Sequence, residues 1–167
     1  HQKFKDFKGL KLSYVGDGNN VLHSLLILAP FLGIDLHYAC PQGYEPSSLV
    51  VRQAKKRAKD GGGNVTAHVD PVECVKGADA VYTDVWTSMG FEAENDRRHE
   101  AFSDWQVDDK LMRGANEQAL FMHCLPAHRG EEVAAAVIDG PQSVVWDEAE
   151  NRLHVQKAIL LWCLGEI

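Results

Sequence analysis

The chain has 167 residues, of which 45% are hydrophobic, and its formal net charge is −7. This length fits one domain, and the apolar content is higher than that of disordered chains. Because the chain is acidic, carries no block of Lys and Arg, and has no apolar run of the roughly 20 residues that cross a bilayer, we expect no nucleic-acid partner and no membrane partner.

Short apolar runs alternate with helical patterns along the chain. The predicted strands cover residues 10–15, 34–39, 65–69, 78–84, 119–122 and 144–146. The predicted helices cover residues 21–31, 46–59, 71–75, 131–138 and 148–164, with another from Ser103 to just before Gly114. Asn19 or Asn20 is the expected cap of the first helix.

This alternation predicts an α/β fold, a Rossmann-like, doubly wound parallel sheet of about five to six strands with helices on both faces. Residues 1–167 form a single domain in this prediction. Ligands of such sheets bind at the carboxyl ends of the strands. The segments 17–20, 84–90 and 123–126 each follow a predicted strand, so we expect the functional residues there.

The segment 86–103 is long, charged and only weakly periodic. Segments of more than about 12–15 residues without regular structure are commonly lids or binding loops in compact domains. At its end, the spacing of Ser103 and Gln106 is that of a capping box, which predicts a helix start at Ser103.

The turn Gly-Asp-Gly-Asn-Asn at residues 16–20 lies between a predicted strand and a predicted helix. A dinucleotide fingerprint, G-x-G-x-x-G, needs glycine at the position of Val21, so this interpretation fails. Two others stay open. The turn is a tight connection with an asparagine cap, or its amide binds a carboxylate beside the helix N-terminus.

Asp84 and Arg152 are each open to two interpretations. Asp84 ends a predicted strand, where it either holds an ammonium group or is a solvated loop residue. Arg152 either pairs with Glu148 one helical turn away or binds a phosphate at a strand-to-helix junction.

His123 and Cys124 end the fifth predicted strand, and together with His128 they offer nitrogen and sulfur ligands. No second cluster completes a tetrahedral set, so we expect no metal. Cys124 is either a packing residue or a nucleophile that needs a base. The four cysteines contain no Cys-x-x-Cys spacing, which indicates reduced thiols of an intracellular protein.

Four stretches together resemble the ornithine carbamoyltransferase family. They are Gly-Asp-Gly-Asn-Asn at 16–20, Asp-Val-Trp-Thr-Ser-Met-Gly at 84–90, His-Cys-Leu-Pro at 123–126 and Glu-Ala-Glu-Asn-Arg at 148–152. The resemblance covers nearly the whole chain. The Ser-Met-Gly loop separates the ornithine enzymes from their aspartate relatives, which carry His-Pro-Leu-Pro where this chain has His-Cys-Leu-Pro.

The family has two α/β domains, and the resemblance identifies this chain as the second, ornithine-binding domain. The Ser-x-Arg-Thr-Arg and His-Pro-x-Gln motifs of the first domain do not occur in the sequence. We therefore expect the carbamoyl-phosphate-binding domain before residue 1, and we expect the chain alone to be inactive.

The resemblance implies roles for five residues on the ornithine side. Asn20 would hold the α-carboxylate, and Asp84 and Ser88 would hold the α-amino group. Met89 would lie in a loop that closes over the substrate. Cys124, coupled to Asp84 as a thiolate–carboxylate pair, would orient the side-chain amine.

On the carbamoyl phosphate side, the resemblance implies contacts from His123, Cys124, Leu125 and Arg152. His123 would donate a hydrogen bond to the oxyanion of the tetrahedral intermediate. The catalytic residues implied in this way are Cys124, Asp84 and His123.

The implied reaction moves the carbamoyl group from carbamoyl phosphate to the side-chain amine of L-ornithine, giving citrulline and phosphate without a metal or organic cofactor. The resemblance also implies arginine biosynthesis or the urea cycle, a homotrimer or a multiple of trimers, and a cytoplasmic location, or the mitochondrial matrix in an animal. Alternatives are a transcarbamylase for putrescine or an acylated ornithine, and a non-catalytic binding or assembly domain.

Overall fold

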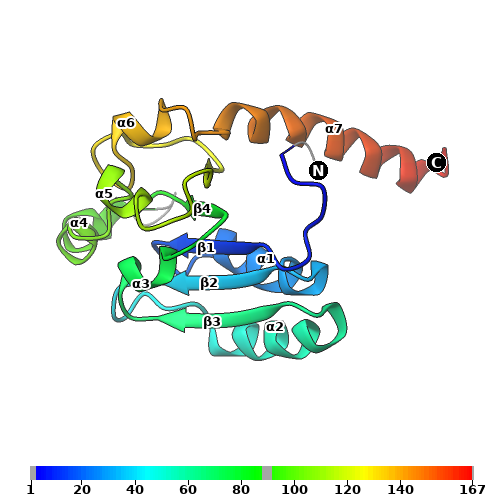
Figure 1. The fold of residues 1–167 in the computed structure, drawn as a ribbon, viewed down its shortest axis with the longest axis horizontal. Helices are drawn as coiled ribbons and strands as arrows, with labels where there is room; N and C mark the ends of the chain where they lie inside the picture. The colour runs from blue at the N-terminus through cyan, green and yellow to red at the C-terminus, as the bar shows by residue number, and fades with distance from the viewer. Residues whose placement is uncertain (1–2, 88–91, 167) are drawn as a thin grey trace.

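The chain folds around one parallel sheet. The computed structural model describes residues 3–87 and 92–166, and within these ranges five strands pair in the spatial order β3-β2-β1-β4-β5 (Figure 1). The strands are β1 (Lys11–Val15), β2 (Asp35–Ala39), β3 (Asn64–His68), β4 (Ala80–Thr83) and β5 (Leu120–His123). All four pairings are parallel, which confirms the predicted fold class.

The strand order reverses between β1 and β4. From β1 the chain moves outward through β2 to β3 and then adds β4 and β5 on the other side of β1. Val15 lies opposite Ala39, and Thr83 lies opposite His123, so the carboxyl ends of neighbouring strands meet at one edge. Open α/β sheets bind ligands in the crevice at such a reversal.

Helices cover both faces of the sheet, as predicted. They are α1 (Asn20–Leu28), α2 (Ser48–Gly61), α3 (Pro71–Val75), α4 (Asn95–Phe102), α5 (Asp109–Met112), α6 (Ala135–Ile138) and α7 (Val145–Leu164), with short 3-10 turns at Pro30–Leu32 and Glu92–Glu94. Residues of α1 and α2 pack with Tyr14 and Leu36 on one face. Residues of α3, α5 and α6 pack with Val81 and Phe121 on the other.

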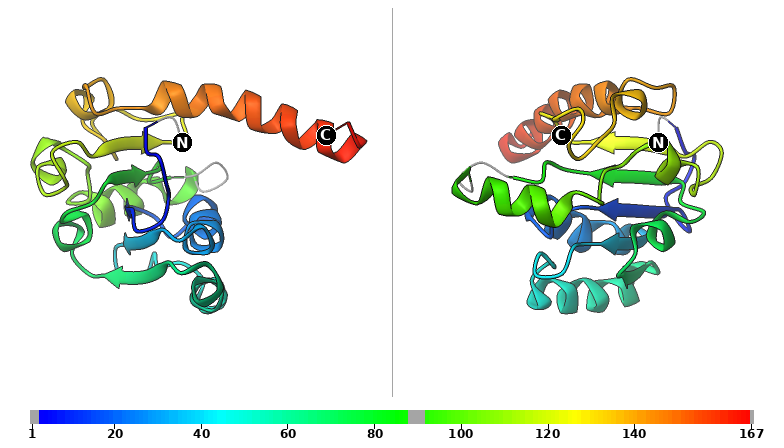
Figure 2. Two further views of the ribbon diagram at one scale, coloured as in Figure 1. Left: turned by 45° about the vertical axis from the view of Figure 1, so that its right-hand side comes forward. Right: turned by 90° about the vertical axis from the view of Figure 1, so that its left-hand side faces the viewer.

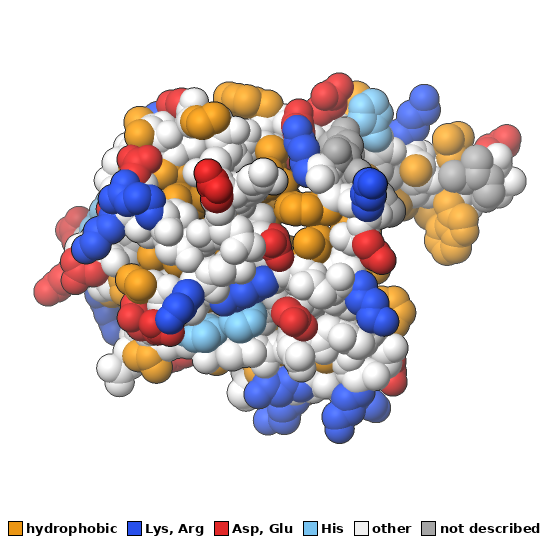
Figure 3. Space-filling view, in the orientation of Figure 1, with side chains coloured by type: hydrophobic (Ala, Val, Ile, Leu, Met, Phe, Trp, Pro, Cys, Tyr) orange, Lys and Arg blue, Asp and Glu red, His pale blue; other side chains and the backbone are white. Residues whose placement is uncertain are grey.

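Helix α7 contacts the sheet near its start and then projects away from the body of the domain (Figures 1 and 2). Several of its apolar side chains are exposed, including Leu153 and Trp162, and hydrophobic side chains are visible along this projection (Figure 3). Among the described helices, none combines the length and the hydrophobicity that a membrane crossing requires.

The predicted sixth strand at residues 144–146 is wrong. Ser143 forms only an isolated parallel bridge with Phe121, and helix α7 begins at Val145. The preceding helix is also shorter than predicted, because α6 begins only at Ala135. Just before this helix, Val133 instead forms isolated parallel bridges with Val107 and Arg129.

The helix start predicted at Ser103 is wrong as well. Helix α5 begins at Asp109, and the side chain of Asp108 caps it by accepting a hydrogen bond from the amide of Leu111 at 2.7 Å. The side-chain amide of Gln106 donates a hydrogen bond to the backbone carbonyl of Glu131, so this side chain does not complete a capping box. This tertiary contact outweighs the local pattern.

The segment 86–103 contains more regular structure than predicted. It includes α4, and the side chains of Arg98 and Phe102 on this helix are buried together with Trp86. The predicted substrate-binding residues Ser88 and Met89 lie outside the described residues, so their expected roles stay predictions.

Candidate active site

The turn between β1 and α1 holds an asparagine at the carboxyl edge of the sheet. Gly18 donates its amide hydrogen to the carbonyl of Tyr44 at 2.8 Å, and a Cβ at this position would come within 2.3 Å of the nitrogen of Pro46. Only glycine fits this approach. Asn19 then caps α1, because its Oδ1 accepts a hydrogen bond from the amide of Val21 at 2.9 Å.

Asp84 lies at the centre of a hydrogen-bonded group drawn from three elements. Its Oδ2 accepts a hydrogen bond from Asn19 Nδ2 at 2.6 Å. Its Oδ1 accepts one from the amide of Val85 at 2.9 Å and one from Cys124 Sγ at 3.1 Å. Asp84 is only 5% exposed, so it is not a solvated loop residue. The structure therefore brings Asp84 and Cys124 together, as expected, and adds Asn19.

The side chain of Cys124 favours its thiol form in the chain without substrate. Burial and the neighbouring carboxylate of Asp84 raise the pKa of this thiol to about 12, from an ordinary value of 9.0. The Cys124 thiol is therefore the donor in its contact with Asp84 at neutral pH. Without substrate, a thiolate here is disfavoured because both groups would carry negative charge in a partly dehydrated site. The thiolate–carboxylate pair acting on a bound amine stays a prediction.

His123 is the last residue of β5, and its ring is fully buried. Its Nδ1 accepts a hydrogen bond from the amide of Leu125 at 2.9 Å, so the ring proton lies on Nε2. That nitrogen is 3.2 Å from Glu132 Oε1, within ion-pair distance, but their relative orientation does not make a hydrogen bond. Both ring nitrogens thus face groups of the chain itself. After Leu125 the chain turns through a cis peptide bond to Pro126.

Glu148 fixes the start of α7 to the sheet. Its Oε1 accepts a hydrogen bond from the hydroxyl of Tyr82 at 2.5 Å, and its Oε2 accepts one from the amide of His123 at 3.2 Å. Burial raises the pKa of Glu148 above its ordinary value. Arg152 lies one turn further along α7 and is exposed, and it forms no ion pair with Glu148 or any other described residue. Of the two interpretations of Arg152, the pairing with Glu148 is therefore wrong, whereas the phosphate contact stays a prediction.

A buried ion pair between Arg98 and Asp17 connects α4 to the turn that follows β1. Arg98 Nη1 on α4 lies 2.9 Å from Asp17 Oδ2 and also donates to the carbonyl of Trp86 at 2.8 Å. The guanidinium of Arg98 stacks 4.9 Å from the ring of Tyr44. Burial raises the pKa of Asp17 to about 6, although the positive charge of Arg98 opposes this shift. The pair ties α4 to the turn that carries Asn19.

The predicted site residues differ in whether the structure brings them into contact. Asp84 and Cys124 are in contact. His123 lies just behind them, and Leu125 is partly buried beside His123. Asn20 is the exposed first residue of α1, while its neighbour Asn19 makes the contact with Asp84. Sequence reasoning treated the two asparagines as alternative caps and assigned only Asn20 to the substrate, so it missed the contact of Asn19 with Asp84.

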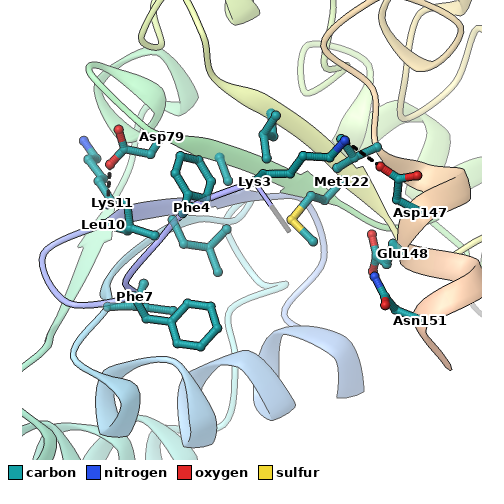
Figure 4. A pocket seen from close by; sticks show the side chains of 15 residues that line it. Lys3, Phe4, Phe7, Leu10, Lys11, Asp79, Met122, Asp147, Glu148 and Asn151 are labelled. Atoms are coloured by element: carbon teal, nitrogen blue, oxygen red, sulfur yellow. Dashed lines mark hydrogen bonds and ion pairs between the residues drawn. The ribbon is translucent and has the colours of Figure 1, made fainter. Parts of the chain in front are cut away.

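A cavity of about 340 Å³ lies away from this cluster. It is enclosed by the segment before β1, one face of the sheet and the start of α7 (Figure 4). Apolar side chains such as Phe4, Phe7 and Met122 dominate its wall, and an ion pair of 2.8 Å joins Lys3 to Asp147 at its rim (Figure 4). We place the candidate active site at the carboxyl edge of the sheet, where Asn19, Asp84 and Cys124 are in contact.

Comparison with known proteins identifies the family of the chain. Residues 8–163 match the family model of the aspartate/ornithine carbamoyltransferase Asp/Orn-binding domain. The ornithine carbamoyltransferase of Methanothermobacter thermautotrophicus is 54% identical over 166 residues, which are 99% of this chain and 55% of that protein. The one from Pyrococcus horikoshii is also 54% identical over 166 residues, covering 99% of this chain and 52% of that protein.

Solved structures give the same result. The ornithine carbamoyltransferase from Pyrococcus furiosus superposes with a TM-score of 0.92 at 54% identity, over 97% of this chain and 52% of that one. The chain spans about half the length of the curated relatives it matches. Fold, sequence match and coverage agree, and the chain belongs to the aspartate/ornithine carbamoyltransferase family, as its Asp/Orn-binding domain.

Proposed function

We propose that this domain binds L-ornithine for a carbamoyltransferase reaction in which the side-chain amine takes the carbamoyl group from carbamoyl phosphate. The products are citrulline and inorganic phosphate. The observation that carries the proposal is the contact of Asn19, Asp84 and Cys124 at the sheet reversal, in a chain 54% identical to ornithine carbamoyltransferases.

The geometry around Asp84 suits an ammonium ligand. A carboxylate offers about four acceptor positions. Among the residues that the structure describes, Asn19, the Val85 amide and Cys124 fill three, which leaves one position on Oδ2. A substrate ammonium placed there would gain a charge-assisted hydrogen bond in a dehydrated site, where such a bond is strongest.

The domain would contribute mainly by preparing the substrate amine. This amine resembles that of lysine, with an ordinary pKa near ~10.4, and only its neutral form attacks the carbamoyl carbon. A partly buried site lowers the pKa of a bound amine because burial disfavours the charged form. The Cys124 thiol lies beside Asp84 and would orient the reacting nitrogen.

Attack forms the new C–N bond and gives a tetrahedral intermediate. Its collapse breaks the bond between carbon and the phosphate oxygen, phosphate leaves with the electron pair, and the nitrogen loses its extra proton. On the family resemblance alone, we assign His123, Leu125 and Arg152 to the carbamoyl phosphate side and Asn20 to the ornithine carboxylate. Ser88 and Met89 are assigned to the ornithine side on resemblance alone.

The remaining phosphate-binding groups would come from a carbamoyl-phosphate-binding domain of a longer protein. We further propose that this protein is a homotrimer or a multiple of trimers, acts in the cytoplasm, or in the mitochondrial matrix of an animal, and serves arginine biosynthesis or the urea cycle. These proposals rest on family membership.

A two-part assay tests the proposed function. The 167-residue chain, given ornithine and carbamoyl phosphate, should produce no citrulline, whereas the longer protein should. Turnover by the chain alone at a rate close to that of the longer protein would contradict the half-site proposal. A preference of the longer protein for putrescine or N-acetylornithine over ornithine would support the alternative substrates instead.

A further inference from the structure

A second cluster of potential metal ligands lies in the loop that follows β5, behind His123. His128, Glu131 and Glu132 each direct one ligand atom to a common place, and these atoms lie within 4.8 Å of one another. The three side chains differ in exposure. Glu132 is fully buried, Glu131 is half-buried and His128 is exposed. The cluster therefore has a fixed inner member and an open outer side.

The carboxylates of this cluster form their ion pairs with histidines. Glu132 lies 3.2 Å from His123. Glu131 lies 3.4 Å from His99 and 3.7 Å from His128. In the ranges 3–87 and 92–166, neither carboxylate pairs with a lysine or arginine. Glu132 Oε1 accepts a hydrogen bond from the amide of His128 at 2.7 Å, but its Oε2 is enclosed and accepts none from a described residue. A buried carboxylate is costly without a compensating charge. A bound cation would supply that charge.

The distances around Glu131 fit metal coordination better than hydrogen bonding. Its Oε2 lies 3.7 Å from His128 Nδ1 and 3.4 Å from His99 Nε2. Charge-assisted hydrogen bonds are shorter, about 2.7–2.9 Å. Two ligands bound to one tetrahedral Zn²⁺, each about 2.0–2.1 Å from the metal, are separated by about 3.4 Å. The 3.7 Å between the two proposed ligand atoms, His128 Nδ1 and Glu131 Oε2, is close to this separation.

We propose that His128, Glu131 and Glu132 bind one Zn²⁺ ion, with water in the fourth position. The donor set of one imidazole and two carboxylates belongs to the ligand types that Zn²⁺ takes. Mg²⁺ and Ca²⁺ prefer oxygen ligands alone and in larger number. The exposed side of His128 gives the ion a path of entry.

His99 would act as a positioning residue for this metal. It lies on α4 and faces the same oxygen of Glu131, as partners of metal-bound carboxylates commonly do. Glu132 also faces the ring of His123. A bound ion would therefore tie α4 to the loop after β5 and fix the support of His123, independently of substrate.

The other candidate cluster, Asp84, His123 and Cys124, is the less suitable of the two. Its carboxylate already accepts three hydrogen bonds. The high pKa of the Cys124 thiol also opposes the deprotonation that Zn²⁺ binding requires. The two clusters share no ligand, so variants separate them.

Calorimetric titration of the metal-free chain with Zn²⁺ tests the proposal. We expect one ion per chain, and His128→Ala and Glu131→Gln should each weaken binding about tenfold or more, since even outer partners of a metal contribute about 10–100-fold. Cys124→Ser should leave the affinity unchanged. The matched control is His154→Ala, which removes an exposed histidine 3.8 Å from Glu150 on α7.

The outcomes separate the proposal from its rivals. Absence of binding would overturn it. Loss of binding in Cys124→Ser but not in His128→Ala would place the ion at the other cluster. An equal loss in His154→Ala would show unspecific surface binding. Co²⁺ gives a second readout, because the visible absorption of a tetrahedral Co²⁺ site should disappear in Glu131→Gln. Circular dichroism in the presence of a chelator confirms that each variant is folded.

Discussion

Asp17→Asn should change how the stability of the domain depends on pH. Asp17 is 7% exposed, and its pKa rises from 3.8 to about 6 because burial outweighs the attraction of Arg98. The folded state therefore holds this proton more tightly than the unfolded state. Stability contributed by Asp17 is greatest below pH ~4 and declines as the pH rises towards 6, by about 3 kcal/mol in total.

The substitution separates this titration from the ion pair. Asparagine does not titrate, and it removes the carboxylate nearest to the buried guanidinium of Arg98, which also lies 3.6 Å from Glu94. The variant should therefore lose about 1.5–3 kcal/mol at neutral pH, the range for a hydrogen bond to a charged group. As the pH falls from 7.5 to 4.5, the free energy of unfolding of the wild type should rise by about 2 kcal/mol relative to that of the variant.

Urea unfolding of both proteins across this pH range measures the difference. Asp139→Asn is a suitable control, because Asp139 is exposed and its ion pair with Arg129 lowers its pKa. Its stabilising contribution is lost as the pH falls, so its pH trend has the opposite sign. Parallel stability curves for the wild type and Asp17→Asn would refute the reasoning about Asp17.

Three further predictions concern the candidate active site. Cys124 should react with iodoacetamide at pH 7.5 far more slowly than exposed Cys163, as peptide mass spectrometry would show, because burial and Asp84 keep it a thiol; equal rates would contradict this. In the longer protein, Cys124→Ser, Asp84→Asn and the double variant should lose similar amounts of kcat/KM, because groups that act as one unit give non-additive losses; additive losses would indicate independent contacts. Arg152→Ala should weaken carbamoyl phosphate binding by about 1.5–3 kcal/mol in an anion titration and leave the unfolding midpoint unchanged, since this side chain is exposed; an unchanged anion affinity would exclude the phosphate contact.

The pattern of apolar residues along the sequence was sufficient to predict the fold, because the strands of a parallel sheet are buried on both faces. Strand β4, Ala80–Thr83, is fully buried and reads as a continuous apolar run. The errors occur where two local signals compete. Val144 and Trp146 are typical of a strand, but the acidic residues Asp147 and Glu148 that follow favour the first turn of a helix, and the helix includes Trp146.

The candidate site was predictable where parallel strands place residues side by side. Asp84 and Cys124 follow the neighbouring strands β4 and β5, so topology alone brings them together. The pairing of Asp17 with Arg98 spans 81 positions along the chain and depends on where α4 packs. No local pattern indicates such a contact, because an arginine on a charged helix is usually a surface residue.

Three carboxylates hold the dipeptide His123-Cys124, and each comes from a different element. Glu148 at the start of α7 accepts the amide hydrogen of His123, Glu132 faces its ring, and Asp84 after β4 accepts the Cys124 thiol. Each of these acidic residues has an ordinary local explanation in the sequence. Their convergence on two adjacent residues is a property of the fold, and it holds the Cys124 sulfur in one orientation before any substrate arrives. Groups fixed in this way need little reorganisation during a reaction, which is where a binding half-site contributes most to catalysis.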